Sequence, residues 1–430
     1  MLRIAKVTTM NNHSIRLVGV VLTVLASNIA AIAAEDGMRK GSRDVAEAVS
    51  WLEAEAHRII RASKREMHDG TAAFPPQAGI GYEAFWLRDY EYTLEGSITS
   101  YSDTELTAAC RLFIRSLNDD GAGVDCVKFD GTPIYKPGFG TLGENPVADG
   151  SQFTVGVAYH TYRKTRDAQL LSEMLTPLVK TMGAVPRNAA TRLVHIDPQR
   201  AWDRCPYGFT DTIRKQGDEL FCSLLYVQAC RQLSDLLLAG QREGESRKWK
   251  EEAGRVAESI RKVFWDANTG LFRAATVTCR EHDIWGSAFA VFLNVADEVQ
   301  SAAIARYFKT HYGEIVQEGQ IRHLPGGVYW EHGGARDQYQ NGAYWATPAG
   351  WFAYTLDIAD PLLADRTILD MVNHFRKYGA CEWIIGEQRQ LPNYLASAAL
   401  PLDGIRAMLE RRQKAQRRNH PNEVDARDSQ

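Results

Sequence analysis

The sequence predicts an all-α fold, an (α/α)6 toroid of twelve helices. From residue 42 onward, apolar residues recur at helical spacing in twelve stretches that are separated by loops. The stretches also alternate in polarity, because those at odd positions are amphipathic and those at even positions are apolar all round. A helix that is apolar on every side is buried on every side. Six inner helices are therefore expected inside six outer ones.

The predicted helices follow one another with short loops between them. The first shows the apolar spacing at Val45, Val49, Leu52 and Ala56, whereas the sixth contains the continuous apolar run 224–227. No short sequence repeat indicates a solenoid. A generic helical array or two helical domains remain the alternatives. The predicted ranges are 44–67, 88–101, 103–117, 151–164, 167–183, 217–239, 246–264, 285–293, 298–312, 344–357, 361–378 and 392–410.

The N-terminus has the order of a signal peptide, predicted over residues 1–33. Basic residues precede the apolar run 17–32, and Ala31-Ile32-Ala33 fits a small-residue cleavage site. The run is short for a membrane span of about 20 residues. We therefore expect a secreted or periplasmic protein with no membrane association after cleavage, with an uncleaved anchor as the alternative.

The rest of the chain is predicted to be one domain, because no linker interrupts it. This domain covers residues 42–410, and residues 411–430 are charged and poor in apolar residues, which is typical of a disordered tail. The net charge of −3 does not favour a nucleic-acid partner. Metal and nucleotide motifs are absent, and neither the 11 His nor the 7 Cys show ligand spacing. No metal or cofactor is predicted.

Carboxylates and aromatic residues gather in the loops that precede the even-numbered helices. Because these loops enter consecutive inner helices from the same end, we expect them to converge on one mouth of the toroid. An N-cap is the alternative role for Asp149 and Asp283, and a structural pair with Arg88 is the alternative for Asp89. The residues of interest are Trp86, Arg88, Asp89, Asp149, Asp211, Trp285, Tyr344, Trp345, Glu382, Glu387 and Asn393.

This combination suits carbohydrate chemistry. Glycoside cleavage needs one carboxyl group to protonate the leaving oxygen and a second to activate water or to attack carbon. The acid has to stay protonated near neutral pH, which burial beside aromatic rings and another carboxylate achieves. Aromatic rings also stack on the C–H faces of pyranoses.

Two motifs resemble a known group. Phe85-Trp86-Leu87-Arg88-Asp89 is similar to the W-x-R-D element of the six-hairpin glycosidases, which include glucoamylases, trehalases and processing α-glucosidases. The segment 264–272, Phe-Trp-Asp-Ala-Asn-Thr-Gly-Leu-Phe, resembles their turn between helix pairs. The resemblance extends over roughly residues 80–405 and implies that Arg88 and Asp89 hold the hydroxyls of the sugar being cleaved.

The resemblance also implies the catalytic pair. Trehalases and processing glucosidases have an Asp acid before the sixth helix, which is matched by Asp211, and a Glu base shortly before the last helix, which Glu382 matches best. Glu387 and then Glu331 are the alternatives for the base. Asp211 is followed by Thr-Ile-Arg-Lys, where the pattern has Asn-Ser. Asp149 with Gly150 resembles a further substrate-binding element.

The resulting prediction is an exported hydrolase that cleaves an α-linked oligosaccharide or glycoside with inversion. The residues predicted to contact the substrate are Trp86, Arg88, Asp89, Asp149, Trp285, Tyr344, Trp345, Glu387 and Asn393. Two other classes stay open. A toroid epimerase or lyase would rely on a base such as His160 or Tyr344, and a glycan-binding protein would bind without turnover.

Overall fold

The structure is a computed structural model that describes residues 44–79 and 81–419. The predicted signal peptide, residues 1–33, lies outside the described residues. The described residues from Ala48 onward belong to one compact unit. Across the described ranges, no helix has the length and the apolar character needed to cross a membrane.

The helices of the described residues match the predicted stretches closely. Most boundaries differ by up to five residues. The tenth helix begins at Ala349 rather than 344, and the last stretch is divided at Leu400 and continues to Asn419. Two four-residue helices, α4 (Pro137–Gly140) and α11 (Tyr312–Ile315), were not predicted. The other α-helices of the described residues are 44–63, α2 (Leu87–Ser97), α3 (Asp103–Arg115), α5 (Gly150–Thr165), α6 (Ala168–Gly183), α7 (Leu220–Ala239), α8 (Glu243–Val263), α9 (Ile284–Phe292), α10 (Glu298–Thr310), α12 (Ala349–Leu356), α13 (Pro361–Tyr378), α14 (Leu395–Ala399) and α15 (Pro401–Asn419).

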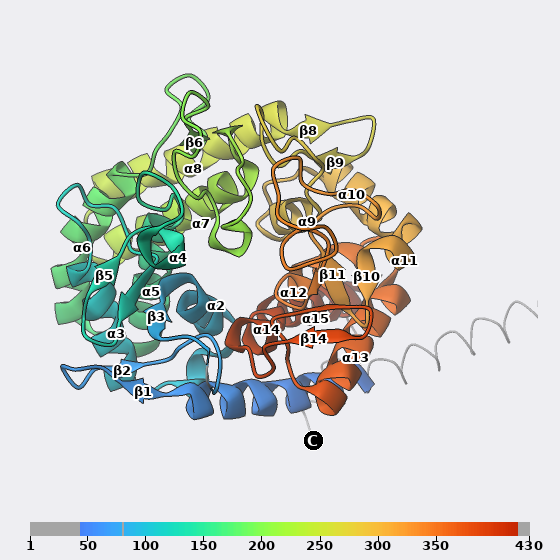
Figure 1. Ribbon diagram of the computed structural model, residues 1–430, viewed down its shortest axis with the longest axis horizontal. Coiled ribbons are helices and arrows are strands. Elements are labelled where there is room, and N and C mark those ends of the chain that lie inside the picture. The colour runs from blue at the N-terminus through green and yellow to red at the C-terminus, as the bar shows by residue number, and fades with distance from the viewer. Residues whose placement is uncertain (1–43, 80, 420–430) are drawn as a thin grey trace, which may run out of the picture. The chain divides into compact units, whose positions relative to one another are not determined.

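The inner helices pack in a closed succession. Helix α2 packs against α5, α5 against α7, α7 against α9, α9 against α12 and α12 against α15, while α14 and α15 return to α2. Figure 1 shows α3, α6, α8, α10 and α13 outside this succession. Helices α7 and α9 are buried along most of their length, whereas α8 buries one face and exposes its charges. The arrangement is compatible with the predicted toroid.

The prediction of a purely helical chain is incomplete, because the loops form five small sheets in the described part of the chain. All pairs are antiparallel, and the strands have two or three residues, too few to show a period of two. One sheet has the order β10 (Val316–Gln317), β11 (Gln320–Arg322), β12 (Tyr344–Trp345), β13 (Trp383–Ile385), β14 (Gln388–Gln390). Another is β3 (Ala84–Trp86), β4 (Cys126–Lys128), β5 (Pro133–Ile134), and the pairs are β1 (Arg65–Glu66) with β2 (Ala72–Ala73), β6 (His195–Ile196) with β7 (Gly217–Asp218), and β8 (Trp265–Asp266) with β9 (Leu271–Phe272).

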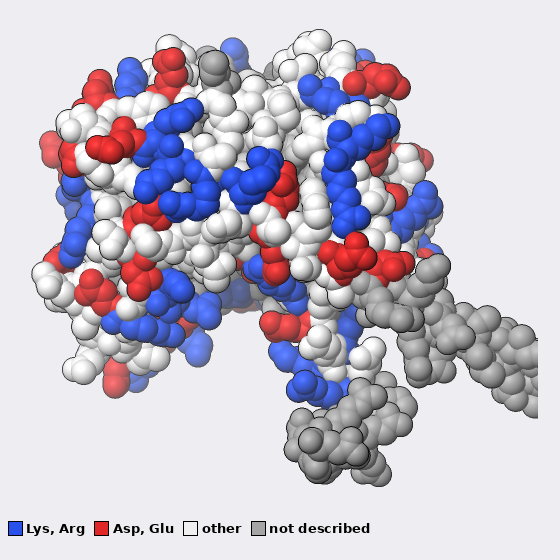
Figure 2. Space-filling view, turned by 90° about the horizontal axis from the view of Figure 1, so that it is seen from below, with Lys and Arg blue, Asp and Glu red and all other residues white. Residues whose placement is uncertain are grey.

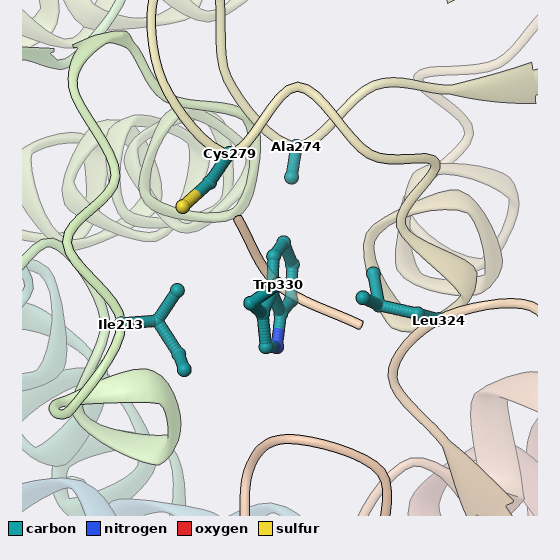
Figure 3. Packing of buried hydrophobic residues seen from close by; sticks show 5 residues of the cluster. All are labelled: Ile213, Ala274, Cys279, Leu324 and Trp330. Atoms are coloured by element: carbon teal, nitrogen blue, oxygen red, sulfur yellow. The ribbon is translucent and has the colours of Figure 1, made fainter. Parts of the chain in front are cut away.

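A buried apolar cluster fixes the loops that carry the candidate residues. Figure 3 shows Trp330 between Ile213 and Leu324, with Ala274 and Cys279 beside it. The Trp330 indole N–H donates to the carbonyl of Gln340 at 2.9 Å. Since Ile213 lies two residues after Asp211, this packing joins the Asp211 loop to the loop around Gln340.

The C-terminal segment differs from its prediction. Helix α15 continues to Asn419, so residues 411–418 are helical and the predicted disorder is wrong there. Arg411 and Arg412 both pair with Asp357 at 2.7 Å, and Arg412 also pairs with Asp365 at 2.7 Å. These ion pairs give the charged segment a partner on α12 and α13, which its composition does not reveal. Residues 420–430 lie outside the described residues.

Charges of both signs are mixed on the surface. Figure 2 shows Lys and Arg side chains interspersed with Asp and Glu over the face seen there, rather than gathered in one field. This distribution agrees with the small net charge of −3.

Candidate active site

Three predicted carboxyl residues come together from distant parts of the chain. Asp89 lies in the first turn of α2, Asp211 follows the 3-10 helix η2 (Gly208–Thr210), and Glu382 immediately precedes β13. The charges of Asp89 and Asp211 both raise the pKa of Glu382, so the three groups lie within electrostatic reach of one another. The structure therefore brings the proposed acid and base into one site.

Asp211 is held by a single amide. The Gln340 side-chain N–H donates to Asp211 Oδ1 at 2.7 Å, and Gln340 Oε1 accepts from the Thr212 N–H at 3.0 Å and the Thr212 hydroxyl at 2.6 Å. Burial raises the pKa of Asp211 to about 6, against the opposing effect of the Gln340 hydrogen bond. The side chain is half-buried, so it keeps access to solvent. Burial thus brings the pKa of Asp211 from the ordinary carboxyl range toward neutrality.

Glu382 is more deeply buried, with 2% of its surface exposed. The Tyr82 hydroxyl donates to Glu382 Oε1 at 2.8 Å. Burial raises the pKa of Glu382 to about 8, opposed by the Tyr82 hydrogen bond and reinforced by the charges of Asp89 and Asp211. Because the pKa values of Asp211 and Glu382 are separated, the two groups together hold one proton over a neutral range.

Asp89 completes the acidic group. It is 3% exposed and accepts a hydrogen bond from the Tyr394 hydroxyl. Burial raises the pKa of Asp89 to about 6, whereas the Tyr394 hydrogen bond and the Arg88 charge lower it.

Arg88 and Asp149 satisfy each other instead of facing a ligand. Arg88 donates from Nε and Nη2 to the two oxygens of Asp149 at 3.1 Å each, and its Nη1 lies 2.7 Å from Asp125. Asp149 also accepts the Gly208 N–H at 2.8 Å and makes no cap bond to α5. A Cβ at Gly208 would lie 1.9 Å from Arg88 Nε. The predicted sugar-binding roles of Arg88 and Asp149 are thus replaced by a structural one, which fixes the loop before Asp211.

Of the three Trp residues predicted to contact the substrate, one lies beside the carboxyl site and two are buried in the core. Trp86 is half-buried and meets Tyr82 edge-on at 4.8 Å between ring centroids, beside the partner of Glu382. Trp285 and Trp345 are both 0% exposed, and their indole N–H groups donate to the carbonyls of Ile321 and Tyr339 at 3.2 Å each. Both rings are enclosed by protein groups, and their contact with a substrate stays a prediction.

Three further predicted residues lie elsewhere. The Tyr344 hydroxyl is directed to the Glu314 carbonyl at 3.5 Å, on the opposite face of β12 from Trp345. Glu387 is exposed at the turn between β13 and β14. Asn393 Oδ1 accepts from Arg58 at 3.0 Å. None of the three has a hydrogen bond to Asp211 or Glu382 among the described residues, and their contact with a substrate stays a prediction.

Four residues of the site were not among the predicted contacts: Tyr82, Tyr339, Gln340 and Tyr394. Burial raises the pKa of Tyr339, and the charges of Asp211 and Glu382 raise it further, which places Tyr339 beside both carboxyls. Gln340 stands in the loop before the tenth helix and Tyr394 in the loop before the last, where the sequence already pointed to function. For Tyr82, which precedes the short strand β3, we find no sequence signal.

The described residues include one group of possible metal ligands, and it lies away from this site. One group of three potential ligands, Glu91, Glu95 and His160, has atoms close enough to share an ion. None of the three touches Asp211 or Glu382 in a hydrogen bond or ion pair. The candidate active site itself consists of carboxyl, phenol and amide groups.

Comparisons with known proteins identify the fold. No protein-family model matches the chain, and no curated protein sequence matches it. Among solved structures, the GH63 mannosylglycerate hydrolase of Thermus thermophilus, in complex with glucose, has a TM-score of 0.60 at 16% identity and covers 82% of this chain and 99% of its own.

Two rhamnosidases are also similar. The enzyme from Klebsiella oxytoca, with rhamnose bound, has a TM-score of 0.59 at 14% identity, and the GH78 enzyme of Bacillus sp. GL1 has a TM-score of 0.56 at 14% identity. Each match covers 84% of this chain, which spans 64% of the Klebsiella chain and 34% of the Bacillus chain. As the sequence motifs imply, the chain has the fold of the six-hairpin glycosidases.

Proposed function

We propose that the protein is a glycoside hydrolase with an (α/α)6 toroid that cleaves an α-linked oligosaccharide or glycoside with inversion. The observation that carries this proposal is the pair of carboxyl groups, Asp211 and Glu382, whose pKa values are raised to about 6 and about 8 beside the carboxyl of Asp89. Two interacting carboxyls that hold one proton between them are the parts that glycoside hydrolysis needs. The reaction uses no cofactor.

In the proposed reaction, Asp211 gives its proton to the glycosidic oxygen as the bond to the anomeric carbon breaks. Glu382 takes a proton from a water molecule, whose oxygen attacks the anomeric carbon from the opposite face. The leaving group departs as an alcohol, the sugar gains a hydroxyl, and the pair returns to its starting state after the proton moves back to Asp211. Asp89 accepts a hydrogen bond from a hydroxyl of the sugar.

The proton in the empty site belongs to Glu382, whose pKa is the higher of the two. The proposed reaction begins from the other distribution, with the proton on Asp211. We assign Asp211 as the acid because it is the more exposed group and because its place before the sixth helix matches the acid of the resembling enzymes. The reverse assignment predicts the opposite dependence on the leaving group, which the variants described in the Discussion measure.

The other two classes have less support. His160 and Tyr344, the bases suggested for an epimerase or lyase, make their contacts with Glu91 and Glu314. Burial raises the pKa values of Tyr82, Tyr339 and Tyr394, so these phenols keep their protons at neutral pH and are poor bases. Binding a glycan without cleaving it does not require two carboxyl groups with pKa values on either side of neutrality, such as those of Asp211 and Glu382.

We also propose export with removal of residues 1–33, which rests on the basic, apolar and small-residue order of the N-terminus. N-terminal sequencing of the protein recovered outside the cytoplasm tests this proposal. Retention of Met1 or Met10 would refute it.

The deciding experiment is a screen of the purified protein against α-glucosides, rhamnosides and mannosylglycerate, the last two because the similar structures are rhamnosidases and a mannosylglycerate hydrolase. We expect release of reducing sugar from at least one α-linked substrate. Proton NMR then shows which anomer forms first, and inversion yields the β anomer. Retention would reject the mechanism, and binding without turnover across the panel would favour the glycan-binding alternative.

A further inference from the structure

A second cluster of ionisable side chains lies on the inner helices, away from the candidate active site. Glu91 and Glu95 are one turn apart on α2 and therefore share a face, and His160 lies on α5. Glu95 is about 9 Å further along the α2 axis than Asp89, and His160 is about 15 Å beyond the first residue of α5. Because both helices begin at the active-site end, the cluster lies toward the opposite end of the inner helices.

The three side chains converge on one point. One ligand atom from each of Glu91, Glu95 and His160 lies within 4.8 Å of the other two. His160 Nε2 is 3.5 Å from Glu91 Oε1, beyond the length of a good hydrogen bond. Glu95 Oε2 and His160 Nε2 are buried atoms without a hydrogen-bond partner. Glu91 is 3% exposed, and its carboxylate faces His160 at this distance of 3.5 Å.

The chain provides room for the carboxylates and adds a third carboxyl, Asp403 of α15, whose charge adds to burial in raising the pKa of both Glu91 and Glu95. A Cβ at Gly156 of α5 would lie 2.2 Å from Glu91 Oε1, so glycine leaves the space that the carboxylate occupies. Gln228 of α7 donates to Glu95 Oε1 at 2.7 Å. Within the described ranges, neither Glu91 nor Glu95 forms an ion pair with Lys or Arg. Two buried carboxylates without a cation are unfavourable.

We propose that Glu91, Glu95 and His160 bind one divalent cation of the first transition row, Zn²⁺ or Mn²⁺. The ligand set decides the class of ion. Carboxylate oxygens with an imidazole nitrogen suit Zn²⁺ and Mn²⁺, whereas Ca²⁺ and Mg²⁺ favour oxygen ligands throughout. At tetrahedral angles, bonds of about 2.0–2.2 Å place the ligand atoms about 3.3–3.6 Å apart. His160 Nε2 and Glu91 Oε1 already have this separation at 3.5 Å, and Glu95 has to approach them by up to about 1.5 Å.

The cation would join α2 to α5. Both helices begin beside the active site, where Asp89 and Gly150 stand in their first turns. The ion would therefore stabilise the inner ring from the end opposite to the chemistry. His160 has 16% of its side chain exposed, so the cluster lies close to the protein surface.

The test uses the full chain, stripped with a chelator and dialysed. Calorimetric titration with ZnCl₂ or MnCl₂ is expected to show one ion per chain, and the melting temperature is expected to rise with ion concentration. Glu95→Gln and His160→Gln should each weaken binding by at least about 100-fold, since each removes a ligand. Glu382→Gln is the matched control, because it neutralises another buried Glu at the active site and should leave ion affinity within about twofold.

Several results would overturn the proposal. One is the absence of Zn²⁺ and Mn²⁺ binding to the stripped protein, which would mean that the carboxyls keep their protons. Another is unchanged affinity in both ligand variants, which would place the ion elsewhere, and a third is tighter binding of CaCl₂ than of either transition ion. Circular dichroism identifies a variant that fails to fold, and the other variant then decides. The readout is binding, so its outcome is independent of whether the protein hydrolyses glycosides.

Discussion

Arg88 and Asp149 form a buried ion pair through two hydrogen bonds of 3.1 Å, and the same carboxylate accepts the backbone N–H of Gly208 at 2.8 Å. This pair joins the start of α2 to the start of α5 and to the loop that ends at Asp211. The pair thus supports the acid through the backbone, without contact with a substrate.

Arg88→Lys is expected to lower both the melting temperature and kcat. Lysine keeps the charge but cannot make the two parallel bonds, which leaves buried oxygens of Asp149 and Asp125 without donors at about 1–3 kcal/mol. We expect kcat/KM to fall by at least about tenfold, through kcat. Steady-state kinetics and thermal unfolding measure this, with Arg111→Lys as the control because Arg111 pairs with Glu173 on the surface. A raised KM with an unchanged melting temperature would restore the sugar-binding role.

Variants of Asp211 and Glu382 are expected to differ in how their activity depends on the leaving group of the substrate. Asp211→Asn removes the proton donor, which typically contributes about 10²–10⁴-fold. We expect that loss with natural glycosides and a smaller loss with activated aryl glycosides, because a good leaving group needs little protonation. Glu382→Gln should harm both substrates equally. The opposite pattern between the two variants would make Glu382 the acid and Asp211 the base.

The pH profile of kcat/KM is expected to be bell-shaped with a maximum near pH 7. The pKa of Asp211 is raised to about 6 and that of Glu382 to about 8, so between these values the pair holds one proton. Below pH 6 both groups are protonated and the base is lost, and above pH 8 both are ionised and the acid is lost. Asp89, also with a pKa of about 6, titrates on the acid side. A profile that stays flat from pH 5 to pH 9 would contradict this account.

Tyr82→Phe is expected to move the alkaline side of this profile to higher pH. The Tyr82 hydroxyl donates to Glu382 and lowers the pKa of that carboxyl, so its removal raises the pKa further. Tyr135→Phe serves as the control, because the Tyr135 hydroxyl donates to the Ser116 carbonyl at 3.0 Å and takes no part in the site. The same alkaline pKa in wild type and Tyr82→Phe would show that the hydrogen bond from Tyr82 does not affect the ionisation that limits activity at high pH.

Glu387→Gln is expected to leave kcat/KM within about twofold of wild type. Glu387 lies exposed at the turn after β13, whereas Glu382 is buried five residues earlier. The two variants make the same chemical change in one short segment, so together they identify the base by kinetics alone. A loss in Glu387→Gln comparable to that in Glu382→Gln would return Glu387 to the role of base.

The helices could be predicted because each repeats its apolar spacing over many residues, and only short features were missed. Tyr344 and Trp345 read as the start of a helix, but they form β12, which is held by pairing with Ile321 and Ile384 from distant loops. Residues 411–418 looked too polar to fold, and their order comes from Asp357 and Asp365. Such partners are visible only once the chain is folded.

The sequence predicted the carboxyl residues of the site but not the side chains that surround them. The position of Asp89, Asp211 and Glu382 before inner helices was sufficient to bring them together. Trp285 and Trp345 stand in the same kind of loop, yet a large ring there fills the core equally well, and composition does not distinguish the two uses. Arg88 and Asp149 have donors and acceptors that could hold a sugar, but these groups are hydrogen-bonded to each other.

The closed succession of inner helices has a consequence for synthesis. Helices α14 and α15 pack against α2, and Arg406 donates to the Gly96 carbonyl at 2.6 Å while pairing with Glu53 at 2.7 Å. The surface of α2 that they cover is translated some three hundred residues before its partner leaves the ribosome. A nascent chain therefore carries an apolar seam until translation is nearly finished, and a stop codon before residue 395 would leave that seam open to aggregation.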